Sequence, residues 1–118
     1  MGQIISATTR YTHFSINRLD KYQIIGYILT MIYEIKIKRK LEKNLNKLPL
    51  MVQKKFFRLV LDLRDKGPEQ PNWPNYSKLS PNEYHCHLRY SWVACWKHEK
   101  KSILIEVYYV GSREKAPY

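Results

Sequence analysis

Two histidines separated by one residue, His85 and His87, are the side chains of this sequence best suited to chemistry. Alternate residues of an extended strand share a face, so both imidazoles would project from one side, about 6.5–7 Å apart along the strand. Histidine titrates near neutral pH, so one ring can accept a proton while the other donates one. Arg113 and Tyr118 follow a later strand-like run and add a planar cation and a phenol. Such a group is suited to cutting or gripping RNA.

RNA carries its own nucleophile, the 2′-hydroxyl, so a protein that cuts it must only align that group, move protons and stabilise charge. His85 and His87 could serve as the acid–base pair, and Arg113 could hold the phosphate oxygens with its planar fork. Tyr118 could stack on a base or orient the phosphate. Three further cations are candidate substrate clamps: Arg89, Lys78 and Lys97. This chemistry requires neither a metal nor another cofactor, and we expect none.

Two other interpretations of the histidine pair remain open. Strand histidines on a solvated face are often only surface polar groups. The spacing of His85 and His87 would also suit zinc, but such a site needs a third and usually a fourth ligand. His98 or Cys95 would have to converge from the next strand, and no second ligand pair with diagnostic spacing is present.

The charge balance indicates an anionic partner. The chain has 118 residues, with 21 Lys and Arg against 10 Asp and Glu, a net charge of +11. Such an excess favours nucleic acid, an acidic protein or an anionic surface. The two cysteines are too few for a disulfide scaffold, which favours a reducing, cytoplasmic location.

The sequence divides at Met31. Residues 1–30 hold few charges and are predicted to be a loosely attached extension, or the product of an upstream start codon, with Met31 as the natural start. The uncharged run from Tyr22 to Tyr33 is shorter than the roughly 20 apolar residues that a membrane helix needs, so we expect no membrane partner. Residues 31–118 carry 18 of the basic and 9 of the acidic residues and form the predicted domain.

Periodicity within 31–118 predicts an α+β domain of order β-α-α-β-β-β. Alternation from Met31 to Lys38 predicts a half-buried strand, and apolar residues at helical spacing over 41–48 and 52–63 predict two helices. A loop rich in Pro and Asn follows, with a brief strand near 76–79. Strands are then predicted at 83–90, 92–98 and 102–110. Short consecutive strands pair antiparallel, so we expect an antiparallel curved sheet with the two-helix hairpin packed on one face.

From Met31 onward the chain resembles the RelE/ParE superfamily of bacterial toxins, and more specifically its RelE-like branch. The first strand, the helical hairpin and two short motifs carry the resemblance. The motifs are K-L-x-x-N-x-Y-x-x-x-L from Lys78 to Leu88 and V-G-x-R-E-x-x-x-Y from Val110 to Tyr118. This chain departs from the family in having His85 and His87 where lysine is frequent. It also lacks an arginine near Val93, for which Arg89 could substitute.

The resemblance implies a RelE-like fold and a cytoplasmic toxin that enters the ribosomal A site and cuts mRNA, inhibiting translation. Its partners would be mRNA, the ribosome and a cognate antitoxin that silences it. Two alternatives remain open: a non-catalytic ParE-like toxin that inhibits a topoisomerase, and an inactive relative that only binds RNA.

Overall fold

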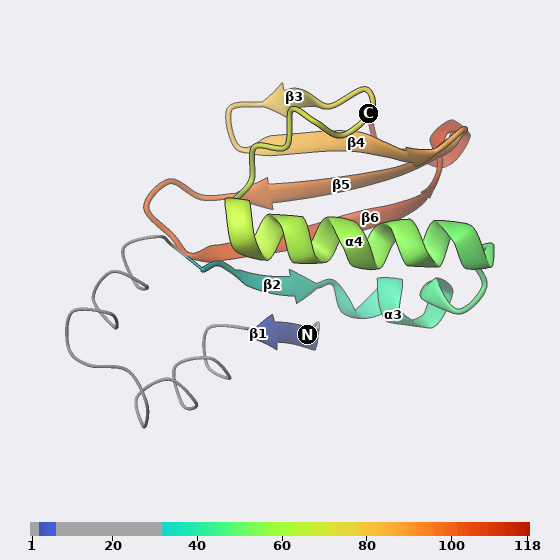
Figure 1. Ribbon diagram of the computed structural model, residues 1–118, viewed down its shortest axis with the longest axis horizontal. Coiled ribbons are helices and arrows are strands. Elements are labelled where there is room, and N and C mark those ends of the chain that lie inside the picture. The colour runs from blue at the N-terminus through green and yellow to red at the C-terminus, as the bar shows by residue number, and fades with distance from the viewer. Residues whose placement is uncertain (1–2, 7–31) are drawn as a thin grey trace.

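The computed structural model describes residues 3–6 and 32–118, and Figure 1 shows these elements as ribbons. Within them, six strands form one sheet in the order β1-β2-β6-β5-β4-β3. The strands are β1 (Gln3–Ser6), β2 (Glu34–Ile37), β3 (Ser77–Ser80), β4 (Glu83–Arg89), β5 (Trp92–His98) and β6 (Leu104–Ser112). The helices are α3 (Arg39–Leu45), α4 (Leu50–Lys66) and a short 3₁₀ helix, η1 (Arg113–Lys115).

The predicted order β-α-α-β-β-β is confirmed for β2 to β6, with the brief strand β3 added at the sheet edge. The hairpin-linked strands β4, β5 and β6 pair antiparallel as expected. One pairing differs from the fully antiparallel sheet of the prediction, because β2 lies parallel to β6. These two strands are far apart in sequence, so no tight turn dictates their relative direction.

The N-terminal strand β1 pairs antiparallel with β2 and extends the sheet on that side. It belongs to the segment predicted to be a loosely attached extension. Residues 1–2 and 7–31 lie outside the described residues, so the extension and the start at Met31 stay predictions. No helix among the described residues has the length and apolar character that a membrane crossing requires.

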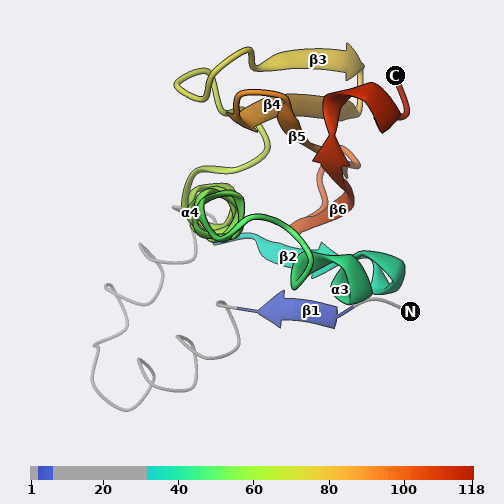
Figure 2. The same cartoon turned by 90° about the vertical axis from the view of Figure 1, so that its right-hand side faces the viewer.

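Helix α4 covers one face of the sheet and contacts β4 and β2 (Figure 2). Its buried side chains recur at helical spacing: Val52, Phe56, Leu59, Val60 and Leu63. The helix ends at Gly67, whose φ of 93° is available to glycine at little cost. A side chain at Gly67 would also meet the Tyr33 ring, which lies 3.0 Å from an ideal Cβ.

The main core lies between α4 and the sheet. Trp96 is fully buried there and stacks on Tyr84 with ring centroids 6.0 Å apart. The Trp96 indole N–H donates to the Pro68 carbonyl oxygen at 2.8 Å, so this large side chain is satisfied as well as packed. Leu41 brings α3 into the same cluster. Trp73, in the loop before β3, donates its indole N–H to the Asp62 carboxylate at 2.9 Å and fixes that loop to α4.

Val93 and Cys95 are fully buried but lie outside this main cluster. They alternate along β5 with Ala94 and Trp96, which belong to it, so they face the side of the sheet opposite α4. That second face is here called the open face. It carries the histidine pair and the C-terminal tail.

Candidate active site

Three rings from distant parts of the sequence meet on the open face. His85 and His87 extend from β4, and their ring centroids are 5.9 Å apart. Tyr118, the last residue, places its ring centroid 4.6 Å from that of His85. The tail that carries Tyr118 follows η1 and lies beside β4 (Figure 2). The structure therefore brings together three of the four residues predicted to be catalytic.

His85 is held by the sheet edge. Its Nδ1 lies 3.0 Å from the Ser77 hydroxyl oxygen, since β3 pairs Ser77 opposite His85. Only 8% of His85 is exposed, and this burial lowers its pKa from the ordinary 6.5, with His87 lowering it further and Ser77 opposing the shift. A neutral imidazole is therefore the main form of His85 at pH 7, and a neutral imidazole can accept a proton.

His87 is half-buried and oriented by a different partner. Its Nδ1 lies 3.2 Å from the Tyr90 carbonyl oxygen. A carbonyl oxygen only accepts, so Nδ1 carries the hydrogen in this arrangement and Nε2 is the ring nitrogen left outside this contact. The backbone N–H of His87 also donates to the Pro74 carbonyl oxygen at 2.8 Å, which fixes this part of β4 against the preceding loop.

The floor of the site is apolar. Val93 and Cys95 are both fully buried, and Cys95 pairs with His85 on one side and Tyr109 on the other. Burial, with a smaller contribution from the charge of Glu83, raises the pKa of the Cys95 thiol to about 12. Cys95 is therefore a neutral packing residue, and it contributes to the dry surroundings that keep His85 uncharged.

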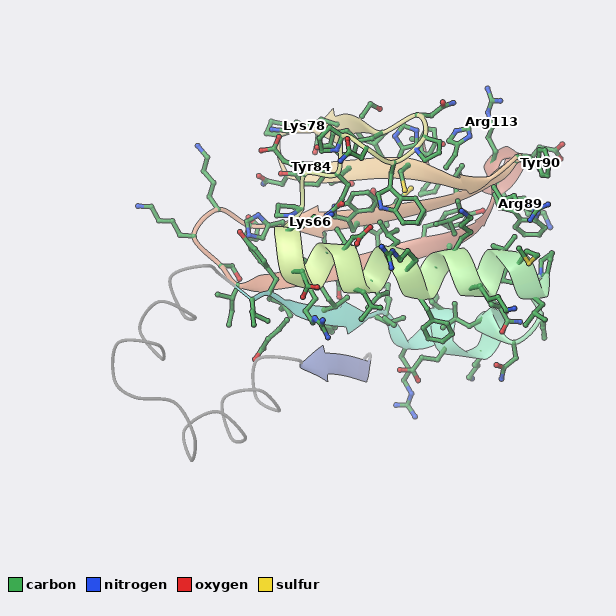
Figure 3. The ribbon with its side chains drawn as sticks, in the orientation of Figure 1. Lys66, Lys78, Tyr84, Arg89, Tyr90 and Arg113 are labelled. Carbon is green, nitrogen blue, oxygen red and sulfur yellow. The ribbon has the colours of Figure 1, made fainter. Side chains whose placement is uncertain are left out.

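Arg113 begins η1, directly after β6, and its backbone N–H donates to the Ser91 carbonyl oxygen at 2.6 Å. Its exposed side chain extends away from the sheet (Figure 3) and makes no ion pair with a carboxylate in the part of the chain that the structure describes. Its positive charge favours the ionised Tyr118 phenol and so opposes the rise in the Tyr118 pKa caused mainly by burial. Arg113 thus lies within electrostatic reach of Tyr118.

The three predicted substrate clamps are placed differently. Arg89 ends β4 with its guanidinium 5.2 Å from the Tyr90 ring centroid, and Figure 3 shows it pointing in another direction from Arg113. Lys97 is tied to Glu106 at 3.2 Å, and Glu106 also pairs with Lys36 at 3.4 Å. The Lys97 ammonium group is therefore engaged by the Glu106 carboxylate.

The structure does not bring Lys78 to the three rings, and its role as a substrate clamp stays a prediction. Lys78 pairs with Tyr84 across β3 and β4, and its ammonium group lies 5.6 Å from the Tyr84 ring centroid. Tyr84 belongs to the core on the α4 side. Because His85 projects from the opposite face, the sheet separates Lys78 from the three rings. Val93, near which the expected arginine is absent, is fully buried, and the Arg89 guanidinium lies over the Tyr90 ring.

Several residues of the site were not found by sequence reasoning. Ser77 orients His85, but nothing in its local sequence reveals the pairing of β3 with β4. Tyr109 donates its hydroxyl to the Ser112 carbonyl oxygen at 2.6 Å, and Tyr108 donates to Glu83 at 2.9 Å. Two consecutive tyrosines are visible in the sequence, but the sequence does not show the bulge in β6. This bulge gives both hydroxyls partners near the open face.

The zinc interpretation finds no support in the described segments. In residues 3–6 and 32–118 there is no group of three His, Cys, Asp or Glu side chains able to hold a metal ion. His98 is engaged elsewhere, since its Nε2 donates to the Ser102 carbonyl oxygen at 2.7 Å. Cys86 and Cys95 are both free and alternate to opposite faces of the sheet.

Comparison with solved structures identifies the architecture. The archaeal RelE–RelB complex from Pyrococcus horikoshii OT3 contains a chain that matches with a TM-score of 0.59 at 18% identity, over 73% of this chain and 100% of that one. The fold is that of RelE. An arginine-to-alanine double mutant of the E. coli toxin RelE in its free state matches with a TM-score of 0.57 at 18% identity, over 73% of this chain and 88% of the other.

The RelE likeness confirms the fold predicted for residues 31–118. It is a likeness of structure: no family model matches the sequence, and no curated protein matches it either. At 18% identity the RelE likeness shows the fold alone, and the activity has to be argued from the residues of this chain.

Proposed function

We propose that this protein is a RelE-type toxin that cuts mRNA in the ribosomal A site without a metal ion. The observation that carries the proposal is the convergence of His85, His87 and Tyr118 on one face of a RelE fold. The ring centroid of His87 lies 5.9 Å from that of His85, and the ring centroid of Tyr118 lies 4.6 Å from it. Two differently held imidazoles provide what 2′-hydroxyl attack requires, a base and an acid.

His85 is the proposed general base. It is buried and its pKa is lowered, so it is ready to take the proton of the 2′-hydroxyl at neutral pH. His87 is the proposed general acid. An imidazole beside a bound phosphate is favoured in its charged form, and Nε2 of His87 would then donate to the leaving 5′-oxygen. The Ser77 and Tyr90 contacts hold the two rings in the orientation that these roles need.

Arg113 is the proposed clamp for the developing phosphorane charge, since no carboxylate of the described residues neutralises it. Tyr118 is the proposed stacking group for the base beside the scissile bond. Its ring now covers His85, so entry of RNA requires the tyrosine to exchange this contact for a base. Arg89 provides a peripheral phosphate contact at the end of β4.

An antitoxin partner belongs to the same proposal. The net charge of +11 favours an acidic binding segment, and α4 exposes four apolar residues, Leu50, Met51, Phe57 and Leu61. One of the two solved neighbours is a RelE–RelB complex. The site of action would be the cytoplasm, where ribosomes are.

The test is a cleavage assay with the full chain, purified ribosomes and a programmed mRNA. The buffer is first treated with EDTA, and Mg²⁺ is then added back because ribosomes need it. We expect cuts at A-site codons in the wild type and their loss in Arg113→Ala, with the thermal unfolding midpoint unchanged. Inhibition of a topoisomerase without mRNA cleavage would favour the ParE-like alternative. Salt-sensitive RNA retention without cutting would favour an RNA-binding relative.

A further inference from the structure

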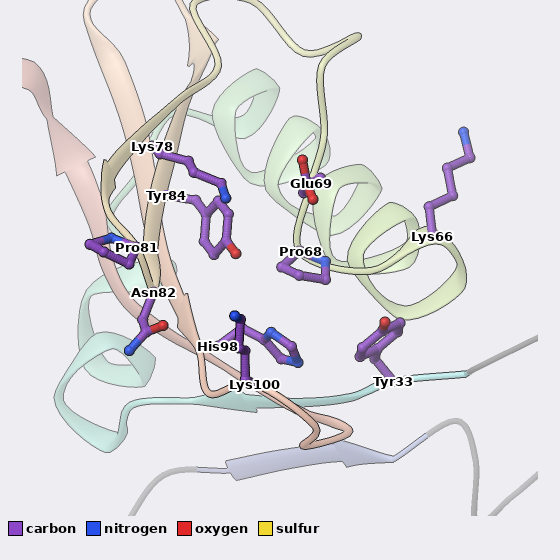
Figure 4. Close-up of a pocket in the computed structure, with 10 residues that line it drawn as sticks. All are labelled: Tyr33, Lys66, Pro68, Glu69, Lys78, Pro81, Asn82, Tyr84, His98 and Lys100. Carbon is purple, nitrogen blue, oxygen red and sulfur yellow. The ribbon is translucent and has the colours of Figure 1, made fainter.

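A cavity lies on the α4 side of the sheet, away from the histidine pair. Its volume is about 340 Å³, and ten described residues from four parts of the chain line it (Figure 4). They come from the residue before β2, the end of α4, the β3–β4 hairpin and the β5–β6 turn. Tyr84 belongs to this cavity while the next residue, His85, faces the other side, so β4 separates the two sites.

The lining is cationic. Lys66, Lys78 and Lys100 are among the ten, and Glu69 is the one acidic residue. Figure 4 shows Lys78 and Lys100 directed toward the space, whereas Lys66 extends away from it. None of the three lysines makes an ion pair within the part of the chain that the structure describes, although four such pairs occur elsewhere in it. A concave site with a surplus of unpaired cations attracts an anion.

The cavity also has aromatic walls and an unused hydroxyl. Tyr84 is 95% buried, yet no described residue hydrogen-bonds its hydroxyl, which Figure 4 shows directed into the space between Pro68 and His98. Burial and the charge of Glu69 raise the Tyr84 pKa, so the group is a neutral donor. Tyr33 and His98 form a second wall, edge to face with centroids 5.7 Å apart.

We propose that this cavity binds one nucleoside monophosphate, with the phosphate held by Lys78, Lys100 and the Tyr84 hydroxyl and the base held against Tyr33 and His98. Cations and a neutral donor suit the phosphate, and flat rings suit the base. The volume lies at the lower end of the range for small-molecule sites, which suits one nucleotide. The ligand is either a free nucleotide or one nucleotide of a single-stranded RNA.

Binding is measured on the full chain by following amide shifts in two-dimensional NMR while AMP, adenosine, inorganic phosphate or a five-nucleotide RNA is added. We expect AMP to shift amides near residues 66–69, 81–84 and 98–100 and to bind at least about tenfold more tightly than adenosine or phosphate alone. If the RNA shifts the same amide resonances more strongly than AMP, the natural ligand is a nucleotide within an RNA strand. If the RNA does not shift them, the natural ligand is a free nucleotide.

Matched variants test the residues. Lys78→Gln combined with Lys100→Gln should weaken AMP binding about tenfold or more, because two charge-assisted contacts are lost. Lys54→Gln combined with Lys55→Gln makes the same change in net charge on the exposed side of α4 and should leave AMP binding within about twofold. Glu69→Gln should strengthen binding, since it removes the opposing charge.

Equal binding of AMP and adenosine, equal weakening by both lysine pairs, or AMP shifts confined to other amides would overturn the proposal. Displacement of AMP by an acidic peptide, but by neither RNA nor another nucleotide, would also overturn it. The assay does not involve cleavage, and the site is on the other face from His85. A failure here therefore leaves the proposed ribonuclease untouched, and the reverse also holds.

Discussion

Replacing His85 with glutamine tests the proposed chemistry most directly. Glutamine has polar atoms that can still bond the Ser77 hydroxyl, but it cannot accept a proton near neutral pH. If His85 is the general base, single-turnover mRNA cleavage should fall about 10²–10⁴-fold, which corresponds to about 2.7–5.4 kcal/mol of barrier.

The structural cost of this substitution should be much smaller. The contact at risk is one hydrogen bond to Ser77, at 3.0 Å, and such a bond contributes about 0.5–1.5 kcal/mol net. The two effects therefore differ enough to be separated. A His85→Gln protein that loses activity should still unfold cooperatively, within about 1.5 kcal/mol of the wild type.

The assay mixes excess toxin with ribosomes holding a defined A-site codon and follows the cut mRNA by primer extension, with unfolding in urea measured in parallel. Lys43→Gln, on the exposed side of α3, is the control and should retain activity within about twofold. A loss of less than tenfold in folded His85→Gln protein would refute the assignment of the base.

Four other outcomes follow from the structure. Because the pKa of His85 is lowered from 6.5 and its neutral form is the active one, the fall of kcat/KM on the acid side of the pH profile should lie below pH 6.5, and His85→Gln should lack this acid limb. Tyr118→Ala should uncover His85 and raise its titration midpoint toward 6.5 in NMR, whereas Tyr118→Phe should not. Burial raises the pKa of both cysteine thiols, so neither should react with Ellman's reagent until the protein is unfolded. Phe56→Ala should cost about 3–5 kcal/mol in urea unfolding and Phe57→Ala, more than half exposed in the wild type, less than about 1 kcal/mol.

Strand periodicity was enough to predict that His85 and His87 share a face. Alternation is a local property of extended backbone, so the sequence reveals it without knowledge of any partner strand. The same holds for α4, whose buried residues recur at helical spacing and whose end is marked by Gly67. These two features needed no long-range information, and both are confirmed.

The placement of Lys78 shows where such reasoning stops. The face on which a strand residue lies depends on its register with the neighbouring strand, and here β3 pairs Lys78 with Tyr84. That register changes within the hairpin, at an irregularity between Lys78 and Ser80. A slip by one residue moves every side chain to the other face. The contact between Ser77 and His85 depends on the same register and was hidden for the same reason.

One irregularity in β6 explains how the tail reaches the histidines. Val107 and Val110 both belong to the core on the α4 side, although a regular strand would place residues three apart on opposite faces. The bulge opposite Cys95 and Trp96 resolves this conflict, and Tyr109 pairs with Cys95 on the open face. From there the Tyr109 hydroxyl bonds the Ser112 carbonyl oxygen at 2.6 Å.

The hydrogen bond from the Tyr109 hydroxyl to the Ser112 carbonyl oxygen fixes the direction in which the chain leaves β6. It also explains Gly111, because a Cβ at that position would lie 2.7 Å from the Tyr109 hydroxyl oxygen and displace it. The chain then enters η1, which presents Arg113, and continues to Tyr118 against His85. The proposed clamp and stacking group are therefore positioned by one extra residue in β6 and by the glycine that makes room for Tyr109.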